Sequence, residues 1–268
     1  RIFMKIGAQL YTVHEPTKTL PDLAEALKKV ADIGYRYVQV SGTCDYEPAW
    51  LKEQLEKNGL CCVLTHTKPE KILANPQKVA KEHSVFGCSY IGLGGMPGLW
   101  NFEEKSDEEL VTGFLKNYRP VMQTFQKNGK KLMYHNHHYE FVRLPNGQDM
   151  IHYLAERTGE ELGFTLDTYW VQYGGLDPAE LICDLKGRVP CVHFKDLAVT
   201  RKLVQKSRGV IMAPVGGGNL NWQKIIKACE FAGTEYALVE QDNSYGADPF
   251  VNLKQSFEFL KAQGLEVE

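Results

Sequence analysis

The sequence lacks several features that would mark particular classes of protein. None of its seven cysteines forms a Cys-x-x-Cys pair, so the spacing gives no support to a zinc ribbon or a thioredoxin-type site. No stretch approaches the roughly 18 to 20 uncharged apolar residues that cross a bilayer. The segment Arg1–Leu10 has no signal-peptide core. These absences predict a cytoplasmic protein that does not enter a membrane.

Excess charge of either sign is also missing. The 31 Lys and Arg residues nearly balance the 33 Asp and Glu residues, and the formal net charge is −2. Proteins that bind nucleic acid or anionic membranes generally carry a basic surface. We therefore expect neither as a partner. Hydrophobic residues make up 43% and charged residues 24% of the chain, which is typical of a globular fold.

What the sequence does contain is a regular alternation. Eight short apolar runs have the composition of buried parallel strands: Ile6–Val13, Tyr35–Val40, Leu60–His66, Cys88–Leu93, Lys131–His137, Leu162–Tyr169, Val189–Phe194 and Tyr236–Glu240. Amphipathic segments with helix-capping signals lie between them, such as Ser106 with Glu109, Asp177-Pro178 and Asp248-Pro249. Leu197–Asn221 reads as a long irregular loop.

Eight strand–helix units in 268 residues predict a single (β/α)8 TIM barrel spanning residues 1–268. The main alternative is a doubly wound open sheet. The sequence contains no Gly-x-Gly-x-x-Gly after the first run and no phosphate-binding P-loop, so the nucleotide fingerprints common in that fold are missing.

Ionisable side chains gather where the predicted strands end. They include His66, His135, His137, Glu140, Asp167, His193, Lys195 and Glu240. In a closed barrel these ends converge on one mouth, and several buried carboxylates would repel one another without a cation between them. Mixed carboxylate and imidazole ligands suit one divalent ion, Mn²⁺ best, while Zn²⁺, Co²⁺, Fe²⁺ and Mg²⁺ also fit. The alternative is a network of ion pairs and hydrogen bonds that closes the mouth.

Six motifs together resemble the xylose isomerase-like TIM barrels, the sugar phosphate isomerase/epimerase group. They are Gly7–Thr12, Tyr134–Phe141, Leu166–Trp170, Val192–Asp196, Val215–Asn219 and Val239–Asp242. The resemblance implies a metal held by Glu140, Asp167, His193 and Glu240. His135 or His137 could replace Glu140 as a ligand, because many relatives place the first Glu earlier, within the strand. The resemblance also implies a sugar substrate and a homo-oligomer.

The predicted chemistry is proton transfer beside a sugar carbonyl through an enediolate, as in isomerases and epimerases. By resemblance the two bases would be Glu140 and Glu240, and His137 is a rival base. Lys195 could hold the developing oxyanion or form an ion pair with Asp196 or Asp167. Gln9, His66 and His135 are expected to bind substrate, and the alternative for Gln9 is a hydrogen bond within the barrel core. Trp100 and Trp170 would stack on the sugar or pack under loops.

Other functions remain open at this point. The same site could eliminate a leaving group as a lyase or dehydratase acting on a keto sugar or a 3-keto-glycoside, with a second, unrelated subunit in some relatives. A non-catalytic sugar-binding barrel is a third candidate. A glycine run, Gly216–Gly218, could cradle a phosphate or form a turn. A metal-dependent nuclease is disfavoured, because the chain has no basic track.

Overall fold

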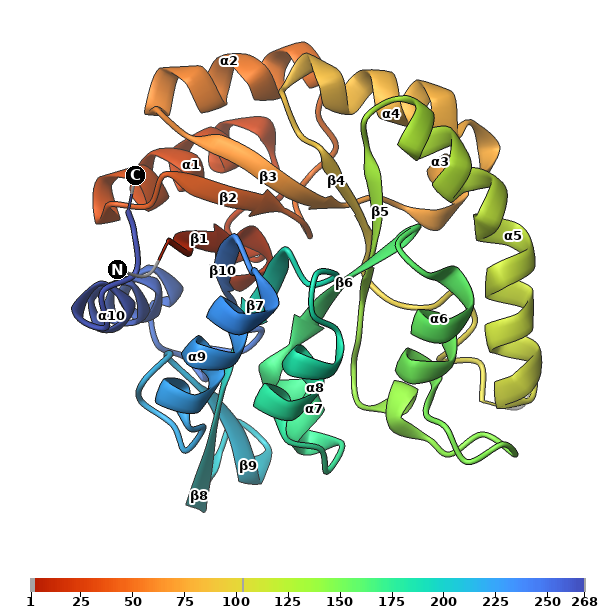
Figure 1. Cartoon of the computed structure of the whole chain (residues 1–268). Helices are drawn as coiled ribbons and strands as arrows, with labels where there is room; N and C mark the ends of the chain where they lie inside the picture. The colour runs from red at the N-terminus through yellow and green to blue at the C-terminus, as the bar shows by residue number, and fades with distance from the viewer. Residues whose placement is uncertain (1–2, 103, 268) are drawn as a thin grey trace.

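The structure is a computed structural model that describes residues 3–102 and 104–267. Eight parallel strands close into a barrel in the order β1-β10-β7-β6-β5-β4-β3-β2, with helices around the outside (Figure 1). The strands are β1 (Lys5–Gln9), β2 (Tyr37–Val40), β3 (Cys61–His66), β4 (Tyr90–Leu93), β5 (Lys131–His135), β6 (Leu162–Asp167), β7 (Cys191–Phe194) and β10 (Tyr236–Val239). The predicted (β/α)8 barrel is confirmed.

In the described residues, ten α-helices and two short 3-10 helices lie between the strands or after the last one. They are η1 (Leu10–Val13), α1 (Leu20–Ile33), α2 (Pro48–Asn58), α3 (Pro69–Ala74), α4 (Pro76–Val85), α5 (Asp107–Lys127), η2 (Tyr139–Phe141), α6 (Met150–Thr158), α7 (Thr168–Tyr173), α8 (Pro178–Asp184), α9 (Trp222–Ala232) and α10 (Pro249–Ala262). The predicted capping box of Ser106 and Glu109 begins α5, and Asp177 and Asp248 cap α8 and α10. No helix in the described residues is long and apolar enough to cross a bilayer.

An apolar cluster fills the end of the barrel where the strands begin. Its buried members are Val63, Leu64, Met133, Cys191 and Leu238, with Tyr37, Tyr90 and Tyr236 against them. The packing is close enough that a Cβ at Gly163 would lie 2.4 Å from the sulfur of Met133. Because this end is closed by apolar side chains, the polar residues of the interior lie toward the opposite end, the mouth.

Three predicted boundaries were wrong. The apolar run that begins at Ile6 leaves the sheet after Gln9, whose side-chain oxygen accepts a hydrogen bond from the Tyr11 N–H and caps η1. That short helix buries Leu10 and Val13, which explains why the run looked continuous. Residues after Asp167 belong to α7, because the Asp167 carboxylate caps that helix. Glu140 lies on η2 and not at the end of β5.

The segment predicted as an irregular loop contains a β-hairpin. Strands β8 (Asp196–Val204) and β9 (Ser207–Ala213) pair antiparallel and project from the mouth end of the barrel (Figure 1). Gln205 and Lys206 form the turn with φ of 43° and 68°. Such turns usually contain Gly or Asn, and the absence of either hid this hairpin from the sequence analysis.

Candidate functional site

Four side chains at the mouth form a candidate metal centre. His135 ends β5, Asp167 ends β6, His193 lies on β7 and Glu240 follows β10. One ligand atom from each lies within 4.8 Å of all the others. All four residues are at most 4% exposed. A second group, His66 with His135 and His193, overlaps the first.

The orientation of His193 favours a cation at this point. Its Nε2 lies 2.6 Å from Oε1 of Gln39 on β2, and because that oxygen only accepts hydrogen bonds, Nε2 carries the proton. Nδ1 then presents a lone pair 2.9 Å from Oε2 of Glu240 and has no hydrogen-bond partner. Two electron donors this close repel each other unless a cation attracts both. The residues present therefore fit a divalent ion.

Asp167 is held so that one oxygen stays available. Its Oδ1 accepts a hydrogen bond of 3.0 Å from the Trp170 N–H, and its own N–H donates to Asn136 Oδ1 at 2.9 Å. Oδ2 is left to face the centre, 3.2 Å from the Lys195 ammonium. Burial raises the pKa of Asp167 to about 7, although Lys195 opposes that effect. Such a carboxyl ionises readily only when a cation is near.

Lys195 is buried among three carboxylates. Its Nζ lies 3.2 Å from Asp167, 3.5 Å from Glu240 and 2.7 Å from Asp242. Burial alone would lower the pKa of Lys195, but these carboxylates outweigh it and raise the pKa. The Lys195 ammonium likewise holds the pKa of Glu240 well below its usual range, against the effect of burial. When Lys195, Asp167, Glu240 and Asp242 are all ionised, these four groups have a formal charge of −2. One divalent cation would neutralise that charge.

Glu140 lies outside both ligand groups. Its Oε1 accepts a hydrogen bond from the Tyr134 hydroxyl at 2.9 Å, and its Oε2 accepts one from the His137 N–H at 2.8 Å. The carboxyl is fully buried. Burial raises its pKa to about 7, although these hydrogen bonds oppose the shift. In this arrangement both oxygens are engaged, and Glu140 positions the segment that carries His137.

The other predicted site residues line the same mouth. His66 Nδ1 lies 3.0 Å from Ser41 Oγ, while His66 Nε2, His137 Nδ1, Trp170 Nε1 and Gln9 Nε2 are buried without partners. Burial lowers the pKa of His66 and of His137 to about 3, so both rings are neutral near pH 7. Unpartnered donors and acceptors at one place are suited to a polyhydroxylated ligand.

The two predicted aromatic contacts flank His137. The Trp100 ring is 5.1 Å from the His137 ring and the Trp170 ring is 5.7 Å from it. Trp100 comes from the loop after β4 and is 47% exposed, while Trp170 belongs to α7. The structure thus brings both tryptophans to one side of the mouth.

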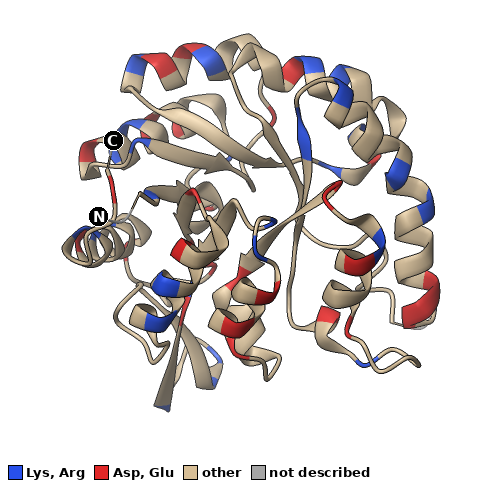
Figure 2. Ribbon diagram, viewed as in Figure 1, with Lys and Arg blue, Asp and Glu red and all other residues tan. Residues whose placement is uncertain are grey.

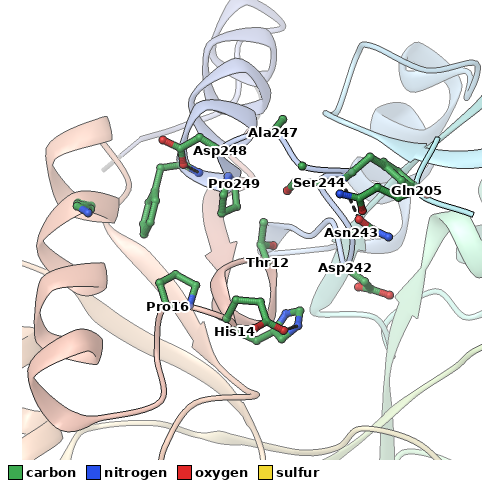
Figure 3. A pocket seen from close by; sticks show the side chains of 15 residues that line it. Thr12, His14, Pro16, Gln205, Asp242, Asn243, Ser244, Ala247, Asp248 and Pro249 are labelled. Carbon is green, nitrogen blue, oxygen red and sulfur yellow. Dashed lines mark hydrogen bonds and ion pairs between the residues drawn. The ribbon is translucent and has the colours of Figure 1, made fainter.

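A cavity of about 860 Å³ opens beside the cluster. Figure 3 shows Thr12 and His14 from the segment after β1 and Asp242, Asn243 and Ser244 from the loop after β10 around it. Gln205 at the turn of the hairpin also lines it. Because Asp242 also binds the Lys195 ammonium, the cavity leads to the buried charges. Its volume is within the range of about 300–1,000 Å³ common for small-molecule sites.

Sequence reasoning did not nominate three residues that organise this site. Gln39 orients His193, Ser41 contacts His66, and Asp242 binds Lys195. Gln39 lies on β2 and Ser41 directly after it. A polar residue within or beside an otherwise apolar strand was the signal that could have identified them as site residues. Asp242 was visible as an acidic residue after the last strand, but its partner depended on the barrel closing.

Asp196 and the glycine run serve the loop and not a phosphate. The buried Asp196 carboxylate accepts hydrogen bonds from the N–H groups of Leu197, Gly216, Gly218 and Leu220 and from the Trp222 indole. A Cβ at Gly218 would lie 2.4 Å from Asp196 Oδ1. The N–H groups of Gly216 and Gly218 are therefore already occupied by a carboxylate, and the Gly217 N–H donates to the Pro214 carbonyl at 2.8 Å. Lys195 pairs with Asp167 and not with Asp196.

This chain is similar to known proteins in sequence and in structure. Inosose dehydratase from Geobacillus kaustophilus is 24% identical over 267 aligned positions, covering 88% of this chain and 85% of the relative. A sugar phosphate isomerase/epimerase structure from Parabacteroides distasonis superposes with a TM-score of 0.77 at 20% identity, covering 98% of this chain and 95% of that one.

A magnesium complex of a xylose isomerase-like TIM barrel protein from Mycobacterium smegmatis gives a TM-score of 0.73 at 15% identity, with 96% and 95% of the two chains covered. At these identities the solved structures support the fold alone. The family model described as the xylose isomerase-like TIM barrel matches residues 27–263, most of the chain. The chain therefore belongs to the xylose isomerase-like TIM barrel family.

Proposed function

We propose that this chain is a divalent-metal-dependent enzyme that transfers a proton beside the carbonyl of a sugar, as an isomerase or epimerase. The observation that carries the proposal is the buried group of His135, Asp167, His193 and Glu240, whose ligand atoms lie within 4.8 Å of one another. Membership of a family with sugar-processing members supports it. A related barrel contains magnesium, and the mixed ligand set also suits Mn²⁺.

We assign the metal ligands as Asp167, His193, Glu240 and His135. His135 takes the fourth place in preference to Glu140, because both oxygens of Glu140 already accept hydrogen bonds. A bound divalent ion would supply Lewis acidity that stabilises negative charge on the substrate oxygens. The remaining roles belong to side chains of this protein.

Lys195 is proposed to stabilise the developing oxyanion. Its ammonium is buried, and the surrounding carboxylates keep it charged. Glu240 is proposed as one of two groups that exchange a proton with the substrate. For the second, His137 and Glu140 compete: the pKa of Glu140, about 7, suits proton transfer near neutrality. The unpartnered Nδ1 of His137 favours His137.

Gln9, His66 and the Trp170 indole are proposed to bind the hydroxyl groups of the sugar, since each has a buried polar atom without a partner. The rings of Trp100 and Trp170 are proposed to contact its C–H face. Together these groups would fix the substrate carbonyl near Lys195. Orientation of this kind contributes much of the rate enhancement in such reactions.

A dehydratase is the second candidate, favoured by the 24% identity with inosose dehydratase. The two reactions begin in the same way, by removal of a proton beside a carbonyl. They differ in the next step, because a dehydratase expels a hydroxyl group from the carbon on the far side of the deprotonated carbon, away from the carbonyl. The leaving oxygen then needs a proton, which His137 or Glu140 would have to supply.

The test is to incubate the metal-loaded protein with a panel of keto sugars and inosose in deuterium oxide. Solvent deuterium in a product of unchanged composition supports the isomerase or epimerase. Loss of one water with an absorbing enone supports the dehydratase. Lys195→Met, which keeps the length of the side chain without its charge, should lower either rate by about 100-fold or more. If no substrate exchanges a proton with metal bound, the proposed function fails.

A further inference from the structure

The cavity beside the metal centre has hydrogen-bonding groups that the proposed reaction does not use. Ser244, Asn243 and Gln205 line it, and Figure 3 shows them around the opening. The Ser244 hydroxyl and the Gln205 side-chain amide form no hydrogen bond with any described residue. Asn243 uses its side-chain oxygen, which accepts the Tyr245 N–H at 2.7 Å, and its side-chain NH₂ is left over. These groups are therefore available to the hydroxyl groups of a ligand.

Another part of the cavity wall is apolar. Pro16, from the segment before α1, lines the cavity together with Pro249 and Phe250, which begin α10. Figure 3 shows Pro16 on the far side of the cavity from Gln205. An apolar wall with a few convergent polar groups is typical of small-molecule sites. This combination suits a sugar, which has hydroxyl groups around its edge and C–H groups on its faces.

The charged groups of the wall are mainly acidic. Glu15, Asp242 and Asp248 line the cavity, and so does Lys29, whose ammonium pairs with Glu25 at 2.9 Å. Among the lining residues no Lys or Arg is left to offset the three carboxylates. Because like charges repel, a phosphate or carboxylate group in this cavity would be disfavoured, while an uncharged group would not.

Two other places that could hold a phosphate do not serve the cavity. The glycine run is engaged by the Asp196 carboxylate and the Pro214 carbonyl. The β8–β9 hairpin carries exposed cations, visible as blue segments in Figure 2: Arg201, Lys202, Lys206 and Arg208. The hairpin contributes Gln205 to the cavity wall and none of these cations. Exposed charges are also screened over about 8 Å at physiological salt.

We propose that this cavity holds the part of the substrate remote from its carbonyl, and that it accepts an uncharged, hydroxyl-rich group and rejects a phosphate or carboxylate. Asp242 connects the two places, because it lines the cavity and accepts a hydrogen bond of 2.8 Å from the Lys195 ammonium. The inference rests on the proposed function for the position of the carbonyl near Lys195. Ser244, Asn243 and Gln205 would then determine specificity for hydroxyl groups, and sugar phosphates would be poor substrates.

A thiol introduced at position 244 reports the charge preference of the cavity without any substrate. The metal-loaded Ser244→Cys variant is treated with a neutral hydroxyethyl and an anionic sulfonatoethyl methanethiosulfonate. Normalised to the rates of 2-mercaptoethanol, this thiol should favour the neutral reagent by about 10-fold at low salt and by less at high salt. Peptide mass spectrometry separates the site from the exposed native Cys61. Equal rates, or a faster anionic reagent, would overturn the proposal.

Charge variants in this background assign the preference to the cavity wall. Glu15→Lys replaces a lining carboxylate by a cation and should remove most of the preference. Glu53→Lys makes the same change in net charge at an exposed position of α2 and should leave the preference unchanged, as should Lys206→Ala on the hairpin. Circular dichroism verifies each fold. An unchanged preference in Glu15→Lys, or a large change in either control, would overturn the proposal.

Matched pairs of sugars extend the test to the reaction. D-fructose and D-ribulose are compared with fructose 6-phosphate and ribulose 5-phosphate for deuterium uptake. The uncharged sugars should have a kcat/KM at least about 10-fold higher, and Gln205→Leu should raise their KM with little change in kcat. A faster phosphate ester would overturn the inference and leave the proposed function standing. A charge-selective thiol without exchange by any sugar would overturn the proposed function, and with it the assignment of the cavity to a substrate.

Discussion

His193 on β7 and Gln39 on β2 are joined across the interior of the barrel by a contact of 2.6 Å between Nε2 and Oε1. The amide oxygen fixes the proton on Nε2 and directs Nδ1 toward Glu240. Residues that orient a metal ligand in this way generally affect metal affinity by about 10- to 100-fold. Gln39 should therefore control the proposed metal centre without touching the metal.

Gln39→Leu should weaken Mn²⁺ binding by about 10- to 100-fold, because the imidazole loses the acceptor that sets its tautomer. Gln39→Glu keeps an acceptor oxygen and should retain wild-type affinity or exceed it. Isothermal titration calorimetry on metal-free protein measures both. Equal affinity for wild type and Gln39→Leu would show that the contact does not orient a ligand.

His135→Ala and Glu140→Gln distinguish the two candidates for the fourth ligand. We expect His135→Ala to lower metal affinity by at least about 100-fold, more than loss of an orienting contact. Glu140→Gln should bind metal almost as wild type, because its oxygens bond to Tyr134 and to the His137 N–H. Elemental analysis after dialysis gives the metal content. The opposite pattern would assign the ligand to Glu140.

Asp196→Ala should destabilise the fold by at least about 3 kcal/mol. The substitution removes the acceptor for five N–H groups, and buried donors without partners each cost about 1–3 kcal/mol. Asp248→Ala, which removes an exposed helix cap, is the comparison and should cost about 1 kcal/mol. Urea unfolding measures both. Similar values for the two variants would mean that water replaces the Asp196 carboxylate.

The ion pair of His152 and Asp149, with 2.7 Å between Nδ1 and Oδ2, should make stability depend on pH. The hydrogen bond that the His152 ring donates to Asp149 raises the pKa of His152. The stabilisation from His152 is therefore complete below about pH 6.5 and is lost as pH rises through the folded-state pKa. The pKa of Asp149 is lowered: burial opposes ionisation, but the hydrogen bonds from His152 outweigh it. Its contribution is lost as pH falls through that lowered value.

His152→Gln should therefore lose more stability at about pH 5.5 than at about pH 9. His152 is partly exposed, so salt should reduce the difference. Asp149→Asn keeps an acceptor for the cap of α6 and removes the charge. In that background the difference between the two pH values should shrink, and the part that remains comes from Asp184, whose Oδ2 lies 3.6 Å from His152 Nε2 and also raises the pKa of His152. A loss independent of pH in the native background would exclude the ion pair as its cause.

The sequence by itself determined the barrel and the places where its chemistry would lie. Apolar runs separated by amphipathic segments of regular length can bury their surfaces in few ways, and closure of eight parallel units is one of them. Asp167, His193 and Glu240 were named as ligands from the resemblance to the family. Their positions at or beside the ends of buried runs, where an ionisable group needs a reason, agree with that assignment. Capping residues such as Ser106 and Asp177 marked helix starts through purely local hydrogen bonds.

Only the tertiary structure decided which of those residues face one another. His135 rather than Glu140 joined the ligand group, because the chain turns into η2 after β5 and gives Glu140 the Tyr134 hydroxyl and the His137 N–H as partners. The contact of Gln39 with His193 spans 154 positions of sequence, and no local pattern predicts such a pair. Distances of this kind are set by barrel closure, a property of all eight strands and not of any one segment.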